Sequence, residues 1–266
     1  MKLGFLGMGK MADAILAGAL NSQLVTPTDV TACEKVPERA KTIAQLRGIA
    51  LAPDPLTLLK KSRVVILAVK PQDLEALLKQ IKPDIKPSHL IVSIAAGKKL
   101  AWLQKQLGAQ TRIVRVMPNL PLTVGQGMSA YAPGKTATLA DVRTVAKILK
   151  AAGAAVQLPE SQFDAVTALS GSGPAFYTWC ARAMIKAGVA AGLDSTAAPL
   201  LALQTMLGTA KVLLEGNITP DDFIRAVSSP HGTTVAGTDV LAASDSDAVL
   251  AKTIQAAADR SAELGK

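Results

Sequence analysis

A glycine-rich turn near the amino end is the feature that most constrains the fold of this chain. Residues 7–12 read GMGKMA, which fits the pattern G-x-G-x-x-A, and they directly follow the short apolar run KLGFL at residues 2–6. A helical pattern, MADAILAGAL, continues from the turn. In a strand, glycine turn and helix arranged in this order, the first N–H groups of the helix can hold a pyrophosphate. The turn therefore predicts a dinucleotide-binding unit.

The same residues also match a second phosphate-binding pattern, GxxxxGK, when counted from Gly4 to Lys10. In that motif a Ser or Thr follows the lysine and binds Mg²⁺, whereas this chain has Met11 at that position. The metal contact is therefore missing, and a kinase or nucleoside triphosphatase is disfavoured.

Apolar runs alternate with helical patterns through the first half of the chain. The runs are short and apolar on both faces, and they cover residues 2–6, 29–33, 64–69, 90–95 and 112–117. Such strands are typical of a parallel sheet covered by helices on both sides. After about residue 158 the apolar period changes to that of helices. Helix starts are marked by Gly173-Pro174, Asp194-Ser195 and Thr219-Pro220. We therefore expect an α/β domain at residues 1–158 and an all-α domain at residues 159–266.

The net charge of +9 is unevenly distributed. Residues 1–158 contain 22 Lys and Arg against 9 Asp and Glu, while residues 159–266 contain 7 against 11. The lysines of the first part are scattered over turns and helix faces, without the basic helix or interleaved aromatic residues of a nucleic-acid reader. The positive charge lies in the part with the nucleotide-binding turn, and no nucleic-acid partner is expected.

The cysteine and hydropathy patterns narrow the class of protein further. Cys33 and Cys180 lie far apart, and the opening MKLGFLGMG has no signal-peptide pattern, so we expect a cytoplasmic protein without disulfides. The most apolar long window, at residues 178–193, is interrupted by Arg182 and Lys186, so no membrane segment is expected.

A metal or serine-nucleophile site is not indicated. His89 and His231 are the only histidines, and they lie far apart, so no cluster of His and Cys ligands can be recognised. The segment SGSGP at residues 170–174 does not satisfy G-x-S-x-G, and it is interpreted as the entry to a helix.

A second candidate site lies at residues 228–237, which read SSPHGTTVAG. Turn-forming residues precede Thr233 and Thr234 directly before a helical pattern, so the loop leads to a helix start with unpaired backbone N–H groups. Such a start can hold an anion. Hydride transfer to a protonated imine requires mainly alignment, since the imine is already electrophilic, and this suits a sequence with few acid–base residues.

Several linked motifs together resemble one known family. They are GFLGMGKMADAI at residues 4–15, ILAVKPQ at 66–72, VSIAAG at 92–97, RVMPN at 115–119, LSGSGPAF at 169–176 and SSPHGTTVAG at 228–237. In this order, and over nearly the whole chain, they are similar to pyrroline-5-carboxylate reductase. The resemblance implies an N-terminal Rossmann-type doubly wound sheet followed by an all-α dimerisation domain. It also implies a homodimer, or a larger oligomer of dimers, that reduces 1-pyrroline-5-carboxylate to L-proline with NADPH or NADH, the final step of proline biosynthesis.

The resemblance also assigns individual residues. For the cofactor it implies Gly7, Gly9, Lys10, Met11, Ala68, Val69, Lys70, Pro71, Ala95, Ala96, Gly97 and Asn119. For the substrate carboxylate it implies Ser229, Gly232, Thr233 and Thr234, with the Thr234 hydroxyl also reaching the ring nitrogen as the catalytic group. Simpler interpretations remain open for three of these positions: Lys70 as a charge at a strand end, Asn119 as a turn residue and Ser229 as a helix cap.

Two other functions agree less well with the sequence. A β-hydroxyacid dehydrogenase shares the two-domain layout, but Tyr177 and Ala181 stand where that family has its Lys and Asn. A redox-sensing regulator would keep the dinucleotide fold without turnover, and the loop from Ser229 to Thr234 argues against it.

Cofactor preference and the role of one histidine stay open. Glu34, after the second strand, suits a free ribose 2′-hydroxyl, whereas Lys35 and Arg39 suit a 2′-phosphate, so we expect both cofactors to be used. His231 stands where the family usually has a glycine, which predicts a positive φ. Its imidazole is expected either in solvent or near the imine.

Overall fold

The computed structural model describes residues 1–265 and divides into two compact units. The first unit contains Met1–Ser172 together with the segment that begins at Ala257, and the second contains Gly173–Ala256. This division differs from the expected one, because residues 159–172 and the last segment of the chain belong with the first unit.

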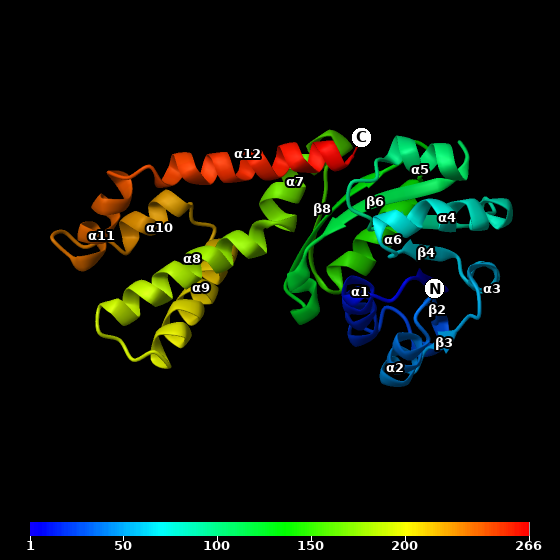
Figure 1. Cartoon of the computed structure of the whole chain (residues 1–266), viewed down its shortest axis with the longest axis horizontal. Coiled ribbons are helices and arrows are strands. Elements are labelled where there is room, and N and C mark those ends of the chain that lie inside the picture. Colours follow the sequence, from blue (N-terminus) through cyan, green and yellow to red (C-terminus); the bar gives the residue numbers. More distant parts are fainter. Residues whose placement is uncertain (266) are drawn as a thin grey trace. The chain divides into compact units, whose positions relative to one another are not determined.

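The first unit is built on one sheet (Figure 1). Its strand order is β3-β2-β1-β4-β5-β6-β7-β8. The strands are β1 Leu3–Leu6, β2 Val30–Cys33, β3 Ala50–Leu51, β4 Val64–Leu67, β5 Leu90–Ser93, β6 Arg112–Pro118, β7 Gly127–Pro133 and β8 Gly153–Gln157. The first six strands are parallel and follow the order 3-2-1-4-5-6 of a Rossmann fold. The expected fold class is therefore confirmed.

Three strands were not expected from the sequence. β3 contains two exposed residues, while β7 (GMSAYAP) and β8 (GAAVQ) are rich in Gly, Ala and Ser rather than in β-branched residues. β7 runs antiparallel to β6, so the sheet is mixed and not parallel throughout.

Helices cover both faces of the sheet in the first unit. They are α1 Lys10–Asn21, α2 Pro37–Arg47, α3 Pro55–Lys61, α4 Pro71–Ile81, α5 Leu100–Leu107, α6 Leu139–Lys150 and the short α7 Phe163–Val166. Phe5 of β1 packs with residues of α1 and α6 in one core cluster. Leu6, the next residue, packs with residues of α3, α4 and α5 in a second cluster. Alternate residues of one strand thus bury against opposite helix layers, as a strand apolar on both faces requires.

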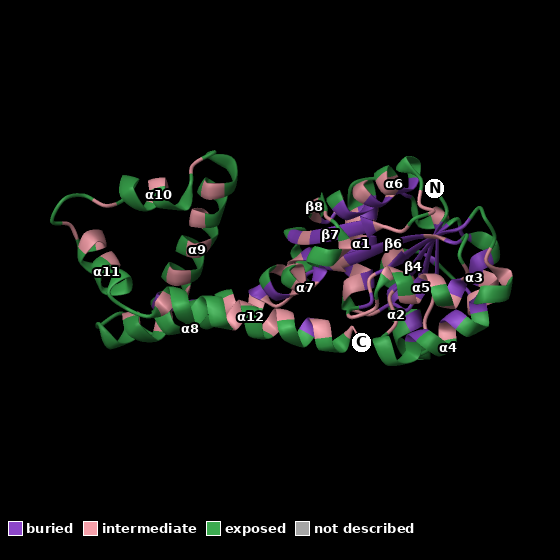
Figure 2. Ribbon diagram, turned by 90° about the horizontal axis from the view of Figure 1, so that it is seen from above, coloured by how far each residue is buried: buried purple, intermediate pink, exposed green. Residues whose placement is uncertain are grey.

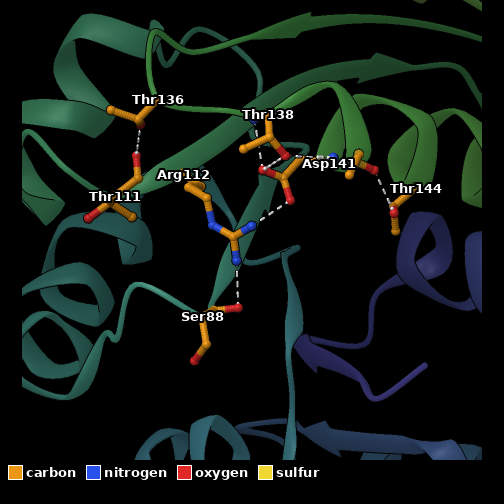
Figure 3. Close-up of polar contacts among 8 residues, drawn as sticks. Ser88, Thr111, Arg112, Thr136, Thr138, Asp141 and Thr144 are labelled. Atoms are coloured by element: carbon orange, nitrogen blue, oxygen red, sulfur yellow. Dashed lines mark hydrogen bonds and ion pairs between the residues drawn. The ribbon is translucent and has the colours of Figure 1, made fainter.

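A polar network holds the amino end of β6, away from the carboxyl ends of the strands (Figure 3). The guanidinium of Arg112 donates to Asp141 Oδ1 at 2.8 Å and to the carbonyl oxygen of Ser88 at 2.6 Å. The other oxygen of Asp141 accepts from the backbone N–H and the hydroxyl of Thr138, which caps α6. Because Asp141 is buried, these partners stabilise a charge that would be costly alone.

The segment after residue 158 is joined to the sheet by a partly buried ion pair. Arg115 of β6 donates to Glu160 Oε1 at 2.8 Å, and its guanidinium lies 4.7 Å from the centre of the Phe163 ring. Phe163 is fully buried in a cluster with alanines of β7. At the end of the chain, the Ser261 hydroxyl donates to Asp164 Oδ1 at 2.7 Å. These contacts explain why the first unit extends past the expected boundary.

The second unit is entirely helical, as expected. Its helices are α8 Gly173–Ala190, α9 Ala197–Glu215, α10 Pro220–Ala226, α11 Thr233–Ala242 and the first part of α12 Ser246–Leu264. Figure 2 shows buried residues gathered in the sheet unit, while these helices are mostly exposed. Among the described residues, α9 is the one helix with the length and hydropathy of a membrane span, and only 6% of its apolar window is buried. The most apolar long helix is therefore α9 and not the segment at residues 178–193.

His89 is buried and uses both ring nitrogens. Its Nδ1 accepts from the backbone N–H of Lys86 at 2.9 Å, so the proton lies on Nε2, which donates to the carbonyl oxygen of Leu59 at 3.2 Å. Burial lowers the pKa of His89, and the nearby charges of Lys86 and Arg112 lower it further, against the opposing effect of the Leu59 hydrogen bond. The folded protein therefore holds this imidazole neutral.

This arrangement predicts a loss of stability in acid. The unfolded chain binds a proton at His89 near pH 6.5, while the folded chain does so only at lower pH. The contribution of His89 to the free energy of unfolding has its full value above about pH 6.5. This contribution decreases as pH falls towards the pKa of His89 in the folded protein. Urea unfolding between pH 5 and 8 is expected to show this decline in the wild type, and His89→Gln, with His231 retained, is expected to show a smaller one. Equal pH slopes would contradict the prediction.

Candidate cofactor and substrate site

Gly7 joins the carboxyl ends of two neighbouring strands. Its φ is +91°, and a Cβ at this position would lie 2.8 Å from the carbonyl oxygen of Ala68, directly after β4. Its N–H donates to the carbonyl oxygen of Cys33 at the end of β2 at 2.8 Å. No other residue fits both this conformation and this space. The structure thus brings together Gly7 and Ala68, two residues that the resemblance assigned to the cofactor.

Gly9 leaves the start of α1 open. It is the N-cap residue of α1, its backbone is extended, and no side chain caps the helix. A Cβ built on Gly9 would find nothing within 4 Å. The first N–H groups of α1, including those of Lys10 and Met11, have no partner within the helix. An uncapped helix start beside open space fits the pyrophosphate of a dinucleotide.

Glu34 follows β2 and turns towards the glycine turn. Its Oε2 accepts from the backbone N–H of Met8 at 2.8 Å, and its Oε1 accepts from that of Val36 at 2.9 Å. The Arg39 guanidinium lies 3.4 Å from Oε1. The neighbouring Lys35 is exposed. The acid and the two cations that the sequence placed at the ribose therefore lie at the same strand end.

The segments after β4 and β5 lie at the same edge of the sheet. Val69 is partly buried, Lys70 is the exposed N-cap residue of α4, and Pro71 occupies its first turn. These positions also satisfy the simpler interpretation of Lys70 as a charge at a strand end. After β5, Ala95 is buried and Ala96 is exposed. Because parallel strands place their carboxyl ends together, these segments border the glycine turn's side of the sheet.

The end of the chain contacts the loop after β5, which sequence reasoning missed. Gly97 has a φ of +74°, and a Cβ there would lie 2.9 Å from the carbonyl oxygen of Leu264 in α12. A Cβ on Gly265 would likewise lie 3.2 Å from Cε of Lys99. The requirement for glycine at position 97 thus comes from a partner more than a hundred residues away, which no local pattern could indicate.

Asn119 connects β6 to two other segments. Its Oδ1 accepts from the backbone N–H of Met128 at 2.8 Å, and its Nδ2 donates to the carbonyl oxygen of Ser170 at 3.2 Å. Ser170 lies in a π-helix, η5 Thr167–Gly171, a structure often found at functional sites. A Cβ on Gly171 would lie 2.5 Å from Cε of Met117 in β6. The side chain of Asn119 therefore joins the segments that contain Met128 and Ser170, in addition to its place in the turn after β6.

The second candidate site is the loop between α10 and α11. Gly232 is the N-cap residue of α11, and no side chain caps the helix. A Cβ on Gly232 would lie 2.4 Å from Oγ of Ser229, and the Gly232 N–H donates to the Ser229 carbonyl oxygen at 2.9 Å. Ser229 is thus folded over the helix start, directly before Thr233 and Thr234. No acidic residue lies in the first turn of α11, so this start also fits an anion.

His231 adopts the backbone conformation expected from the sequence. Its φ is +61°, in the left-handed region, and its side chain is exposed. Within residues 1–265, no group of three or more His, Cys, Asp or Glu side chains could hold a metal ion. His231 is an exposed loop residue in a conformation that a glycine would adopt more easily.

Two family models match the chain. The one described as pyrroline-5-carboxylate reductase dimerisation matches residues 160–264. The one described as NADP oxidoreductase, coenzyme F420-dependent, matches residues 2–97. The first match includes the loop before α11 and the second includes the glycine turn, while residues 98–159 lie outside both matches.

Curated relatives and solved structures match over the full length. A pyrroline-5-carboxylate reductase of Methanosarcina acetivorans is 41% identical, with 100% of this chain and 98% of the relative covered. Another, from Pseudomonas aeruginosa, is 38% identical over 100% and 97%. The structure of a pyrroline-5-carboxylate reductase from Coxiella burnetii has a TM-score of 0.96 at 29% identity, covering 100% and 98%. That of a Plasmodium falciparum pyrroline carboxylate reductase with NADP bound has a TM-score of 0.88 at 27% identity, with the same coverage.

The two glycines of the turn predict opposite outcomes when replaced. Gly9→Ser places a capping hydroxyl and a Cβ where the anion would lie, so we expect stability to rise by a few tenths of a kcal/mol or stay unchanged. NAD(P)H affinity is expected to fall at least about tenfold, ~1.4 kcal/mol. Gly7→Ala forces a strained φ against the backbone of Ala68, and we expect it to lower the free energy of unfolding by more than ~2 kcal/mol.

Fluorescence titration with NADH and NADPH, together with thermal unfolding, checks both variants. A Gly9→Ser protein that binds both dinucleotides as tightly as the wild type would remove the start of α1 from the cofactor site.

Proposed function

The chain belongs to the pyrroline-5-carboxylate reductase family, and from this we propose that it reduces 1-pyrroline-5-carboxylate to L-proline by hydride transfer from NADPH or NADH. The observation that carries the proposal is that one chain contains two uncapped helix starts at glycine N-caps, α1 and α11. One suits a dinucleotide pyrophosphate and the other suits a small carboxylate. The protein would thereby complete the biosynthesis of proline.

The cofactor is held by the first unit in this proposal. The N–H groups at Gly9, Lys10 and Met11 bind the pyrophosphate, while Gly7 lets the turn approach it. Glu34 and Lys35 lie at the adenine ribose. The remaining contacts come from the segments after β4, β5 and β6: Ala68, Val69, Lys70, Pro71, Ala95, Ala96, Gly97 and Asn119. When bound, NAD(P)H supplies the hydride.

The substrate is held by the loop before α11. The Ser229 hydroxyl and the N–H groups at Thr233 and Thr234 bind the carboxylate. Gly232, whose N–H donates to the Ser229 carbonyl oxygen, lets the carboxylate approach the helix start. The Thr234 hydroxyl accepts a hydrogen bond from the N–H of the protonated imine and so fixes the ring. The hydride adds to the imine carbon, the carbon–nitrogen double bond becomes single, and the nitrogen receives its electron pair. The protein supplies alignment and needs no further acid or base.

Oxidation of NAD(P)H in the presence of pyrroline-5-carboxylate tests the proposal. We expect turnover with both cofactors, with kcat/KM values within about a thousandfold of each other, ~4 kcal/mol. A dinucleotide-sensing regulator would bind the cofactor without turnover. A hydroxyacid dehydrogenase would oxidise a hydroxyacid instead, although Tyr177 and Ala181 replace that family's Lys and Asn.

The second unit presents an apolar stripe that we propose a second copy covers. On α9, Leu200, Leu203, Leu207 and Leu214 are 71%, 50%, 53% and 85% exposed, and their spacing places them along one side of the helix. An unpartnered face of this kind is costly in water. The family match to a dimerisation region supports a homodimer, or a larger oligomer built from dimers.

We also propose that the enzyme works in the cytoplasm. Both cysteines are free, Cys33 partly buried and Cys180 exposed, as expected where thiols are kept reduced. Burial raises the pKa of the Cys33 thiol, and the charges of Asp54 and Glu34 raise it further. This thiol therefore stays protonated and unreactive.

Replacing Thr234 is expected to reduce catalysis. Thr234→Ala removes the hydroxyl that contacts the ring nitrogen, and we expect kcat/KM to fall tenfold to a hundredfold, ~1.5 to 3 kcal/mol. His231→Gly is the matched control in the same loop. It relieves a left-handed conformation, and we expect a change below about threefold, ~0.7 kcal/mol.

Both variants are assayed from pH 5.5 to 8.5. A large loss in His231→Gly with a changed pH profile would place its imidazole near the imine, and an unchanged Thr234→Ala enzyme would remove the loop from the chemistry.

A charge in the apolar stripe is expected to separate the subunits. Leu207→Glu lies in the middle of the stripe, whereas Leu46→Glu places the same change on α2, where Leu46 is 66% exposed. Light scattering is expected to show dissociation or aggregation for Leu207→Glu only, with loss of activity. A wild type that is a fully active monomer at assay concentration would rule out the proposed dimer.

A further inference from the structure

Glu34 is the one acid that contacts the glycine turn through its side chain in the described part of the chain. Its carboxylate joins two segments, since Oε2 accepts from Met8 in the turn and Oε1 accepts from Val36 before α2. The side chain is only 6% exposed, while that of Arg39 is 50% exposed. The carboxylate is therefore held in one place by backbone donors, independently of its weak contact with Arg39.

The occupied acceptor sites decide what else this carboxylate can bind. Oε1 already accepts from Val36 and faces Arg39, whereas Oε2 accepts only from Met8. A carboxylate oxygen can accept two hydrogen bonds, so Oε2 keeps one acceptor position. A hydroxyl group can donate to it. A phosphate dianion has no proton to donate and brings negative charge against the carboxylate.

The nearby cations compensate only partly for this repulsion. Lys35 and Arg39 are both exposed, so solvent and salt screen their attraction for a phosphate. The charge of Glu34 is nearly buried and is screened less. We therefore expect the repulsion of a 2′-phosphate by Glu34 to exceed its attraction by Lys35 and Arg39.

We propose that Glu34 sets the cofactor preference of this chain towards NADH, by accepting a hydrogen bond from the ribose 2′-hydroxyl and repelling a 2′-phosphate. This inference rests on the proposed function only for placing the adenine ribose at the end of β2, where dinucleotide folds bind it. The proposed function uses both cofactors, and this inference adds that NADH is preferred over NADPH.

Two adenosine nucleotides isolate the contribution of the 2′-phosphate. Calorimetric titration of the full-length protein with 5′-AMP and with adenosine 2′,5′-bisphosphate measures binding without the nicotinamide or the imine substrate. We expect 5′-AMP to bind at least tenfold more tightly, and NADH to bind at least tenfold more tightly than NADPH. A wild type that prefers the phosphorylated ligands overturns the proposal.

Glu34→Gln removes the charge and keeps an oxygen that can accept from Met8. We expect the ratio of affinities to move at least tenfold towards the phosphorylated ligands. Glu38→Gln makes the same charge change at an exposed position in the first turn of α2, and its ratio is expected to stay that of the wild type. If Glu34→Gln weakens both ligands equally, Glu34 only braces the turn and the proposal fails.

A third variant keeps the test decisive if Glu34→Gln does not fold. Arg39→Gln leaves the carboxylate without its exposed cation, so the preference for the unphosphorylated ligands is expected to widen, and a narrowed preference contradicts the proposal. The reductase assay is read separately. A protein that discriminates between the nucleotides as expected but does not reduce pyrroline-5-carboxylate would disprove the proposed function and leave the role of Glu34 intact.

Discussion

The close approach of Gly7 to Ala68 is the constraint on which the cofactor edge of this protein depends. With a φ of +91° and no room for a Cβ, Gly7 lets the turn after β1 lie directly against the end of β4. This contact fixes where α1 begins. The buried side chain of Met8 then anchors the turn in the core, and Glu34 holds the Met8 N–H. A single backbone position thus determines where the first N–H groups of α1 lie, because a side chain there would push the two strand ends apart.

Much of the first unit could be predicted because most of its strands can be recognised from their own apolar residues. β1, β2, β4, β5 and β6 are short, mostly apolar runs that alternate with helical patterns, which indicates a parallel sheet covered on both sides. β7 and β8 could not be predicted in the same way, since small residues such as those of GAAVQ are compatible with many structures. The compact units differ from the expected division at residue 158, because the first unit depends on the contacts of Arg115 with Glu160 and of Ser261 with Asp164. Such pairs are distant in sequence and leave no local pattern.

The candidate site, like the fold, has features that the sequence predicts and features that depend on distant contacts. The glycines at positions 7, 9 and 232 could be identified from the sequence, since a motif places each of them beside a helix start. What the sequence could not reveal is how polar side chains are already occupied. Glu34 appeared as a candidate for the ribose, yet its contacts with Met8 and Val36 exist only once two strand ends meet. Asn119 was assigned to the cofactor, and the structure adds that its amide already joins Met128 to Ser170. Composition gives the residue type, whereas the fold decides which of its hydrogen bonds remain available.

The two helices that we propose to bind ligands begin at a glycine. Side-chain caps are also absent from α2, α4 and α5, but those helices begin at Val36, Lys70 and Lys99. α3, α6 and α10 start at Asp54, Thr138 and Thr219, whose side chains accept from backbone N–H groups of the first turn. α1 and α11 start at Gly9 and Gly232, and nothing from a side chain caps them. Glycine at the N-cap costs only a few tenths of a kcal/mol relative to serine, because it adopts the extended conformation readily. A chain can therefore leave these N–H groups open for an anion at little cost in stability. A glycine N-cap of this kind occurs in each unit, and in the proposed function one holds a pyrophosphate and the other a carboxylate.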